Sequence, residues 1–257
     1  MNFIGQAYIQ EQLEFILPDI KDNGSAAFML RGPSGYGKTD LAVRICNYVS
    51  GSRYTMKLGD VTTFYDDIRT HLVDEIHLCR TPEMYYPLID SNEYIFVFTT
   101  NSDSTLPEAL VNRCYDFIFD NYEDEDLLQI ISSRVPEMVL PNEQLVYIIE
   151  FCNRNPRIIL STVQRLVMWQ RRYSIRIADL SMEDFSIIME RVFGVKDGVD
   201  ILCRRYLEAL TGLGGRASLS SIQSQLHVDE GTIKAQIEPA LLYKNKITIT
   251  SRGRSII

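Results

Sequence analysis

The chain has 257 residues, of which 46% are hydrophobic and 23% are charged, an ordinary composition for a globular protein that allows two or three small domains. No window approaches the roughly 18 uncharged apolar residues of a membrane span, and the first residues lack the layout of a signal peptide. The five scattered cysteines favour neither a disulfide framework nor a zinc site. We therefore expect a cytoplasmic protein with no membrane partner.

The first half of the chain has the pattern of an open α/β sheet. Residues 26–31 form a short apolar run, which a glycine-rich loop joins to a predicted helix at Thr39–Val49. Two further apolar runs, at 71–73 and 94–98, each end at polar residues. Runs of this kind are typical of buried parallel strands whose carboxyl ends carry functional side chains.

The second half changes to helical periodicity after Phe119. A spacing near 3.6 predicts helices at 123–135, 142–153, 156–173 and 181–192, the last preceded by a capping box, and these form an all-helical lid. Three more helices at 199–210, 218–226 and 229–242, followed by strands at 247–250 and 255–257, predict a winged helix. The expected fold is an α/β phosphate-loop core with a parallel sheet (1–120), a helical lid (121–194) and a C-terminal winged helix (195–257).

The charge is distributed unevenly along the chain. The net charge is −8, but residues 200–257 carry +3 and the preceding residues −11. The last seventeen residues contain four cations and no acid, namely Lys244, Lys246, Arg252 and Arg254. Because phosphate contacts require clustered Lys and Arg, we predict that these four residues of the winged helix contact DNA.

The loop after the first strand matches the phosphate-binding pattern G-x-x-x-x-G-K-[ST]. Glycines in such a loop let backbone N–H groups point at phosphates, the lysine reaches the β- and γ-phosphates, and the final hydroxyl is a magnesium ligand. We therefore predict that the loop binds ATP and Mg²⁺. The residues concerned are Gly32, Pro33, Ser34, Gly35, Tyr36, Gly37, Lys38 and Thr39.

Acidic and amide side chains follow the next two strands. Asp74 and Glu75 lie at the end of the 71–73 run, 35 residues after Thr39, and Asn101 follows the 94–98 run. We predict that Asp74 holds the magnesium ion together with Thr39, that Glu75 polarises the attacking water and that Asn101 positions it.

Five ordered motifs resemble the AAA+ clade that contains the RuvB Holliday-junction motor and the clamp loaders. They are the phosphate loop, Val-Asp-Glu-Ile-His at 73–77, Thr-Thr-Asn at 99–101, Leu-Val-Asn-Arg at 110–113 and Asn-Pro-Arg at 155–157. The C-terminal part is similar to the RuvB winged helix in order and spacing, through Gly-Val-Asp at 198–200, Asp-Glu-Gly-Thr-Ile at 229–233 and Ser-Arg-Gly-Arg at 251–254. The resemblance covers nearly the whole chain.

This resemblance implies roles that the spacing alone does not give. It makes Arg113 a finger that reaches the γ-phosphate of a neighbouring subunit, and Arg157 a sensor on the lid that contacts the nucleotide of its own subunit. It places Arg252 and Arg254 on a DNA-contacting wing. It also implies a homo-oligomeric ring, a hexamer, that acts on duplex or branched DNA.

The motifs leave three functions open. The first is a ring motor that translocates duplex or branched DNA, as RuvB does in branch migration. The second is a loader or switch that binds DNA and a partner protein, which is favoured by the triplet Asn112-Arg113-Cys114, similar to the Ser-Arg-Cys of clamp loaders. The third, a ring whose nucleotide only joins subunits, would not need Glu75. The stretch from Ile76 to Tyr94 is too short for the RuvA-binding β-hairpin of RuvB, so dependence on RuvA is not expected.

Overall fold

The computed structural model describes residues 3–22, 24–61, 63–101, 106–194, 199–251 and 253–257. The chain divides into two compact units, an N-terminal unit (residues 1–136 and 154–163) and a C-terminal unit (137–153 and 164–257). Residues of the predicted lid occur in both units, and the division into three domains stays a prediction. Within the described residues, no helix has the length and apolarity that a membrane span requires.

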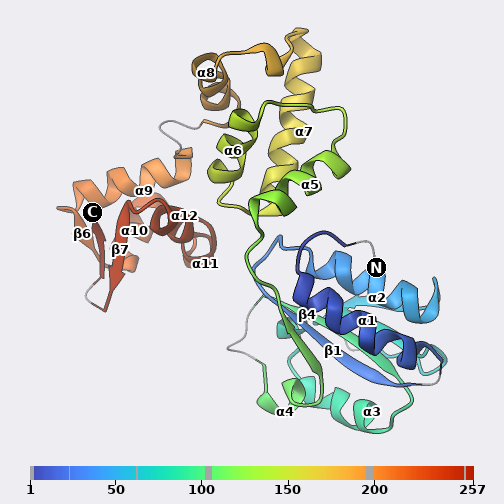
Figure 1. The fold of residues 1–257 in the computed structure, drawn as a ribbon. Coiled ribbons are helices and arrows are strands. Elements are labelled where there is room, and N and C mark those ends of the chain that lie inside the picture. Colours follow the sequence, from blue (N-terminus) through green and yellow to red (C-terminus); the bar gives the residue numbers. More distant parts are fainter. Residues whose placement is uncertain (1–2, 23, 62, 102–105, 195–198, 252) are drawn as a thin grey trace. The chain divides into compact units, whose positions relative to one another are not determined.

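The N-terminal unit is built on a five-stranded sheet whose order is β2-β3-β4-β1-β5 and whose neighbouring strands are all parallel (Figure 1). The strands are β1 (Ala26–Arg31), β2 (Thr55–Leu58), β3 (Thr70–Asp74), β4 (Ile95–Thr100) and β5 (Tyr115–Ile118). The central strand β4 is buried along its whole length, which explains its continuous apolar run. Its register pairs Ala26 with Ile95 and Arg31 with Thr100, so β1 and β4 end at the same edge of the sheet.

Helices cover both faces of this sheet. The helices that flank the sheet are α1 (Ala7–Asp22), α2 (Lys38–Ser50), α3 (Tyr86–Asp90) and α4 (Glu108–Val111), and the unit also contains α5 (Asp124–Arg134). In Figure 1, α1 and α2 lie on one side of the strands, and α3 and α4 lie on the other. One core cluster joins Ala27 and Met29 of β1 to Phe96 and Phe98 of β4 and to Leu110 of α4. Alternate residues of these strands therefore face opposite layers of helices.

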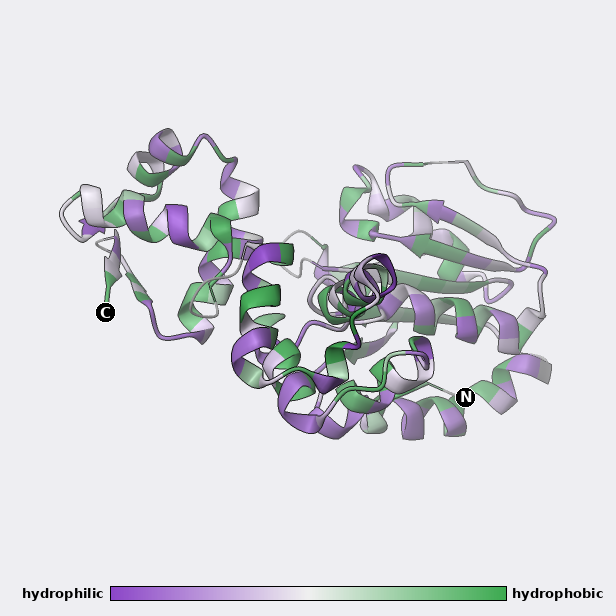
Figure 2. Cartoon of the chain, turned by 90° about the horizontal axis from the view of Figure 1, so that it is seen from above, coloured by the Kyte–Doolittle hydropathy of each residue, from purple (hydrophilic) through white to green (hydrophobic). Residues whose placement is uncertain are grey.

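The C-terminal unit contains the remaining helices and a small sheet. Its elements are α6 (Asn142–Phe151), the later part of α7 (Pro156–Tyr173), α8 (Met182–Phe193), α9 (Ile201–Gly212), β6 (Arg216–Ala217), α10 (Leu219–Leu226), α11 (Glu230–Thr232), α12 (Glu238–Tyr243), β7 (Ile247–Thr250) and β8 (Gly253–Ile256). The sheet has the order β6-β8-β7 and is antiparallel, which makes residues 201–256 a winged helix. Figure 2 shows hydrophobic and hydrophilic residues alternating along the helices near the C-terminus, as expected for helices that bury one face.

Most of the predicted elements are confirmed, and the differences have local causes. The predicted helix at 229–242 is interrupted by a π-helical turn at Ile233–Ile237, which ends two residues before Pro239. Proline lacks an N–H and its ring clashes with the carbonyl four residues earlier, which accounts for the break. The edge strands β2 and β5 were not predicted, because their exposed and partly buried residues give no continuous apolar run.

A buried ion pair connects the wing to the core of the winged helix. Arg254 on β8 donates through Nε to Oε1 of Glu238 (2.7 Å) and through Nη2 to Oε2 (3.2 Å). The Tyr206 hydroxyl also donates to Glu238 Oε1 (3.0 Å). The Glu238 side chain is only 5% exposed and that of Arg254 15%. The hydrogen bonds to the Glu238 carboxylate raise the pKa of Arg254, which keeps the guanidinium charged.

We predict that Arg254→Ala lowers the free energy of unfolding by about 3–5 kcal/mol, because it leaves the Glu238 carboxylate buried without its cation. Denaturant unfolding of the full chain measures this. The double variant Glu238→Gln with Arg254→Met removes both charges and keeps an acceptor for Tyr206, so it is expected to regain most of the loss. A single variant within about 0.5 kcal/mol of the wild type contradicts this account of the pair.

Candidate nucleotide site and winged-helix surface

The phosphate-binding loop connects β1 to α2 and depends on the backbone freedom of its glycines. Gly35 and Gly37 have φ values of 87° and 90°, in the left-handed region that side chains other than glycine rarely adopt. A Cβ atom on Gly35 would lie 2.4 Å from Oδ1 of Asn155, so the loop also approaches the start of α7 too closely for a larger residue. The N–H groups at the start of α2 add the positive end of a helix dipole.

Lys38 is the buried cation of this loop. Its ammonium group donates to the carbonyl oxygens of Gly32 (2.8 Å) and Pro33 (2.9 Å), and the residue is 5% exposed. Burial lowers the pKa of Lys38, and the nearby carboxylates of Glu75 and Asp74 oppose that shift. The side chain is therefore held beside the loop backbone, where a phosphate group would bind.

Asp74 at the end of β3 is the centre of a hydroxyl network. Its Oδ1 atom accepts hydrogen bonds from the hydroxyl of Thr39 (2.8 Å) and from that of Thr99 (2.5 Å). Thr39 and Asp74, which the sequence predicted as magnesium ligands, therefore lie together. Hydroxyl and carboxylate oxygens are ligands that Mg²⁺ prefers, so these residues fit that ion.

Glu75, the residue after Asp74, has an unusual backbone conformation. Its φ of 55° is left-handed, and its N–H donates to the Thr99 hydroxyl (3.1 Å). The Glu75 carbonyl packs against Gly59, where a Cβ atom would lie only 2.3 Å away. Its Oε2 atom is buried and makes no hydrogen bond, although it lies 3.2 Å from Nδ1 of His77. A buried carboxylate oxygen without a donor is available to accept from a bound water molecule.

Two residues near Glu75, His77 and Thr99, lie within the sequence motifs but were assigned no role from the sequence. Nδ1 of His77 also lies 3.1 Å from the Thr100 hydroxyl, so His77 lies between the end of β4 and the Glu75 carboxylate. Thr99 joins Asp74 to the backbone of Glu75. Thr99 and Thr100 precede Asn101, and their position directly after the apolar run at 94–98 was the sequence signal that could have indicated them.

Asn101 lies just after β4, and its residue is exposed. The backbone bond from Gly32 N to Thr100 O (3.3 Å) places this strand end beside the start of the phosphate loop. The predicted position of Asn101, next to the loop, agrees with this geometry. Its role in positioning water stays a prediction.

The start of α7 contacts the phosphate loop through Asn155 and Arg157. Asn155 Nδ2 donates to the Ser34 carbonyl (2.8 Å), and its Oδ1 accepts from the backbone N–H groups of Arg157 (3.1 Å) and Ile158 (3.3 Å). Arg157 is exposed and lies 3.4 Å from the Ser34 hydroxyl through Nη1. Asn155 is thus a helix cap that also holds the loop, a double role that the sequence did not indicate.

The residues before α1 and after β5 enclose the other side of the loop. Gln6 exchanges two hydrogen bonds with the backbone of Asp120, at 2.7 and 2.9 Å. The Tyr122 hydroxyl donates to the Tyr36 carbonyl (2.7 Å), and the Tyr36 hydroxyl donates to Asn121 (3.0 Å). Tyr36, predicted as a nucleotide-binding residue, is therefore a buried part of the loop support.

Arg113 lies at the opposite edge of the sheet from the phosphate loop. It precedes β5, which runs parallel to β1 with Phe28 opposite Tyr115, whereas the loop begins where β1 ends. At about 3.3 Å per residue, these two edges are roughly 20 Å apart, further than an arginine side chain extends. Arg113 therefore cannot reach the phosphate loop of its own chain, and its role as a finger stays a prediction.

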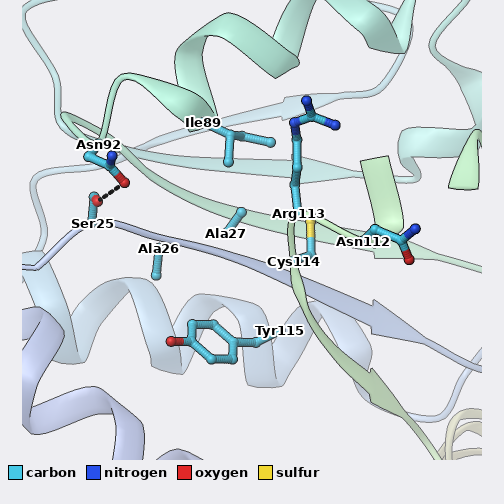
Figure 3. A pocket seen from close by; sticks show the side chains of 9 residues that line it. All are labelled: Ser25, Ala26, Ala27, Ile89, Asn92, Asn112, Arg113, Cys114 and Tyr115. Carbon is cyan, nitrogen blue, oxygen red and sulfur yellow. Dashed lines mark hydrogen bonds between the residues drawn. The ribbon is translucent and has the colours of Figure 1, made fainter. Parts of the chain in front are cut away.

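Arg113 also lines a pocket of about 310 Å³ at that edge of the sheet. Figure 3 shows Arg113 and Ile89 on the side of the pocket opposite Tyr115, with Ser25 hydrogen-bonded to Asn92.

The predicted DNA-contacting residues have different environments. Lys246 is exposed immediately before β7, and Lys244 donates to the Glu150 carbonyl (3.3 Å). Arg252 lies outside the described residues. Arg254 forms the ion pair with Glu238, a structural contact that the sequence did not indicate. Contact of these residues with DNA stays a prediction.

The fold and the site together define a class of protein, a phosphate-loop nucleotide-binding core of the AAA+ type followed by a winged helix. Residues 196–257 match the family model described as the RuvB C-terminal winged helix domain. The chain is 24% identical to the Holliday junction branch migration complex subunit RuvB of Mycoplasma pneumoniae, over 99% of this chain and 92% of that protein. It is 28% identical to the RuvB subunit of Mycolicibacterium vanbaalenii, over 98% of this chain and 81% of that protein.

Solved structures show the same fold. The Thermotoga maritima RuvB Holliday junction branch migration motor matches with a TM-score of 0.81 and 22% identity, covering 99% of this chain and 93% of that one. The resemblance to RuvB that the sequence motifs indicate is therefore confirmed, as is the predicted fold class.

We predict that Gly59→Ala lowers the free energy of unfolding by about 1–3 kcal/mol, because the new methyl group would overlap the Glu75 carbonyl. Thermal or denaturant unfolding measures the loss. Gly212→Ala is the matched control, since a Cβ there meets no atom within 4 Å. Equal stability of the two variants would show that Gly59 does not constrain Glu75.

Proposed function

We propose that this chain is an ATP-hydrolysing motor of the RuvB type, which uses Mg²⁺ and moves duplex or branched DNA. The observation that carries the proposal is the cluster of Lys38, Thr39, Asp74 and Glu75 at one edge of the sheet, in a chain that also has a RuvB-type winged helix. Relatives over nearly the full length are named as subunits of the Holliday junction branch migration complex.

Each residue of the cluster has a defined part in the proposed reaction. The loop from Gly32 to Gly37 presents N–H groups to the phosphates, and Lys38 exchanges its carbonyl partners for phosphate oxygens. Thr39 and Asp74 would hold Mg²⁺, which neutralises charge on the phosphates when bound. Glu75 polarises the attacking water through the buried Oε2 atom.

Two further residues complete the nucleotide site. Arg157 contacts the phosphates from the start of α7, since it already lies beside Ser34 of the loop. Asn101 positions the attacking water from the end of β4. Both assignments follow the resemblance to RuvB and the position of each residue at the loop.

Arg113 supplies positive charge to the γ-phosphate of the adjacent subunit in this proposal. The support for it is the position of Arg113 at the sheet edge opposite its own phosphate loop. Such an arrangement requires a homo-oligomer in which every loop meets a neighbour's arginine, and we propose a hexameric ring in the cytoplasm.

Lys244, Lys246 and Arg252 contact DNA phosphates in this proposal. Arg254 is the fourth candidate, and it supports the wing through Glu238. The +3 charge of residues 200–257 in a chain of net charge −8 supports this surface.

A loader or switch that binds DNA and a partner protein is the second candidate. It is favoured by residues 76–94, which contain short helices and no strand, so the β-hairpin that RuvB uses to bind RuvA is lacking between β3 and β4. Migration of a synthetic four-way junction by the purified protein separates the two. ATP-dependent junction migration supports the motor, and ATPase activity stimulated by DNA without migration supports the loader.

We predict that Lys38→Ala abolishes ATP binding, because it removes the cation that meets the phosphates. Glu75→Gln is expected to retain ATP binding and to lose about 10²-fold or more in turnover, because only the water-polarising carboxylate is removed. Equilibrium binding of a fluorescent ATP analogue and steady-state phosphate release measure the two effects. If Glu75→Gln turned over ATP at the wild-type rate, the role of Glu75 in polarising the attacking water would be refuted. That result would favour a ring whose nucleotide only joins subunits.

We predict that Lys246→Ala with Arg252→Ala flattens the log–log dependence of DNA affinity on salt by up to about two units per engaged subunit. Basal ATPase activity should be retained, and its stimulation by DNA should fall. Fluorescence anisotropy with duplex DNA at several salt concentrations measures the slope. Arg254 is left intact because its removal leaves the buried carboxylate of Glu238 without its cation.

The matched control for this experiment is Lys21→Ala with Arg53→Ala, which removes the same charge from exposed positions of the N-terminal unit. An equal change of slope in both double variants would mean that net charge, not the wing, determines DNA affinity.

A further inference from the structure

The guanidinium group of Arg113 is fixed by three hydrogen bonds. Nε donates to Oδ1 of Asp90 (3.0 Å), Nη2 donates to Oδ2 of Asp90 (3.2 Å), and Nη1 donates to the carbonyl of Ala109 (2.9 Å). A guanidinium group has five N–H donors, so two remain for another acceptor. The guanidinium group of Arg113 is therefore oriented and still able to bind a phosphate group.

A single short helix supplies both side-chain contacts. Asp90 is the last residue of α3, and Tyr86 is the first. The Arg113 guanidinium carbon lies 4.8 Å from the centre of the Tyr86 ring, a cation–π contact. The hydrogen bonds to Asp90 set the plane of the guanidinium group, and the Tyr86 ring covers one face of it. Helix α3 therefore determines where Arg113 points.

The pair is exposed and cannot be explained as a source of stability. The side chains of Arg113 and Asp90 are 35% and 55% exposed. Ion pairs at such positions contribute little to the free energy of folding. The effect of a bidentate contact here is on the conformational freedom of Arg113, which has many rotamers when it is not held.

We propose that Asp90 is a positioning residue, which holds Arg113 ready to contact the γ-phosphate of a neighbouring subunit. This inference rests on the proposed function of Arg113. Because Asp90 immobilises the side chain before ATP is turned over, less conformational entropy is lost when the transition state forms. Asp90 does not touch the nucleotide, so it acts only through Arg113.

A purely electrostatic role of Asp90 and a positioning role predict opposite changes in kcat when its carboxylate is removed. Neutralising this carboxylate makes the surroundings of Arg113 more positive, and on electrostatic grounds alone that would favour a negatively charged transition state. Loss of orientation would slow the reaction. The sign of the change in kcat therefore separates a positioning residue from a merely neighbouring charge.

The experiment measures steady-state ATPase activity, assembly and thermal stability of the full chain with Asp90→Ala, Asp90→Asn, Arg113→Ala and the double variant Asp90→Ala with Arg113→Ala. Asp90→Ala is expected to lower kcat roughly tenfold, with KM for ATP, Tm and assembly unchanged. Asp90→Asn, which keeps one acceptor oxygen, should lose less. Arg113→Ala should lose about 10³-fold, and the double variant no more than that.

Asp179→Ala is the control, since Asp179 is an exposed acid 3.8 Å from Arg176 in the C-terminal unit, and its kcat should equal that of the wild type. An unchanged or raised kcat in Asp90→Ala, beside a large loss in Arg113→Ala, overturns the role of Asp90 and leaves the proposed function intact. Loss of assembly in Asp90→Ala also overturns it, because Asp90 would then be an interface residue. Full activity of Arg113→Ala refutes the finger itself, and with it the role of Asp90.

Discussion

One carboxylate oxygen, Oδ1 of Asp74, joins the parts of the nucleotide site. It accepts from Thr39 on α2 and from Thr99 on β4. Strand β3, which carries Asp74, is not adjacent to β1, because β4 lies between them in the sheet. At about 4.8 Å between strands, the gap from β3 to β1 is roughly 10 Å, and the Thr99 hydroxyl lies within it. The parallel order of the sheet thus brings these three oxygen atoms together.

The sequence predicted the parts of this site that a single segment defines. The loop at 32–39 lies between a buried strand and a helix, and both β1 and α2 are where the apolar pattern indicated. Helix α7 has the predicted bounds, 156–173, because its apolar residues recur at helical spacing over its full length. The partners of Thr99 and His77 could not be predicted, since they depend on which strands are neighbours.

Two arginine ion pairs show more clearly that a sequence motif does not give the partner of a side chain. The motifs indicated Arg113 and Arg254 by their positions in the sequence, but a motif does not say which acid each side chain meets. Asp90 lies 23 residues before Arg113, and Glu238 lies 16 residues before Arg254. The packing of the helix that carries each acid, and not a motif, sets its partner, so only the structure reveals the pairs. One pair is buried, so that loss of either partner leaves an unpaired charge, whereas the other is exposed and holds a side chain in one orientation.

The anchoring of the wing has a mechanical consequence. Gly253 begins β8 where a Cβ atom would lie 2.6 Å from the Ala217 carbonyl, and the next residue, Arg254, is tied to Glu238 of α12. The hairpin is therefore fastened near its turn to a neighbouring strand as well as to a helix. Through Glu238 the same contact reaches Tyr206 on α9, so β6, α12 and α9 all hold the start of β8 in place. We expect the hairpin to move with the core of the winged helix as one rigid piece.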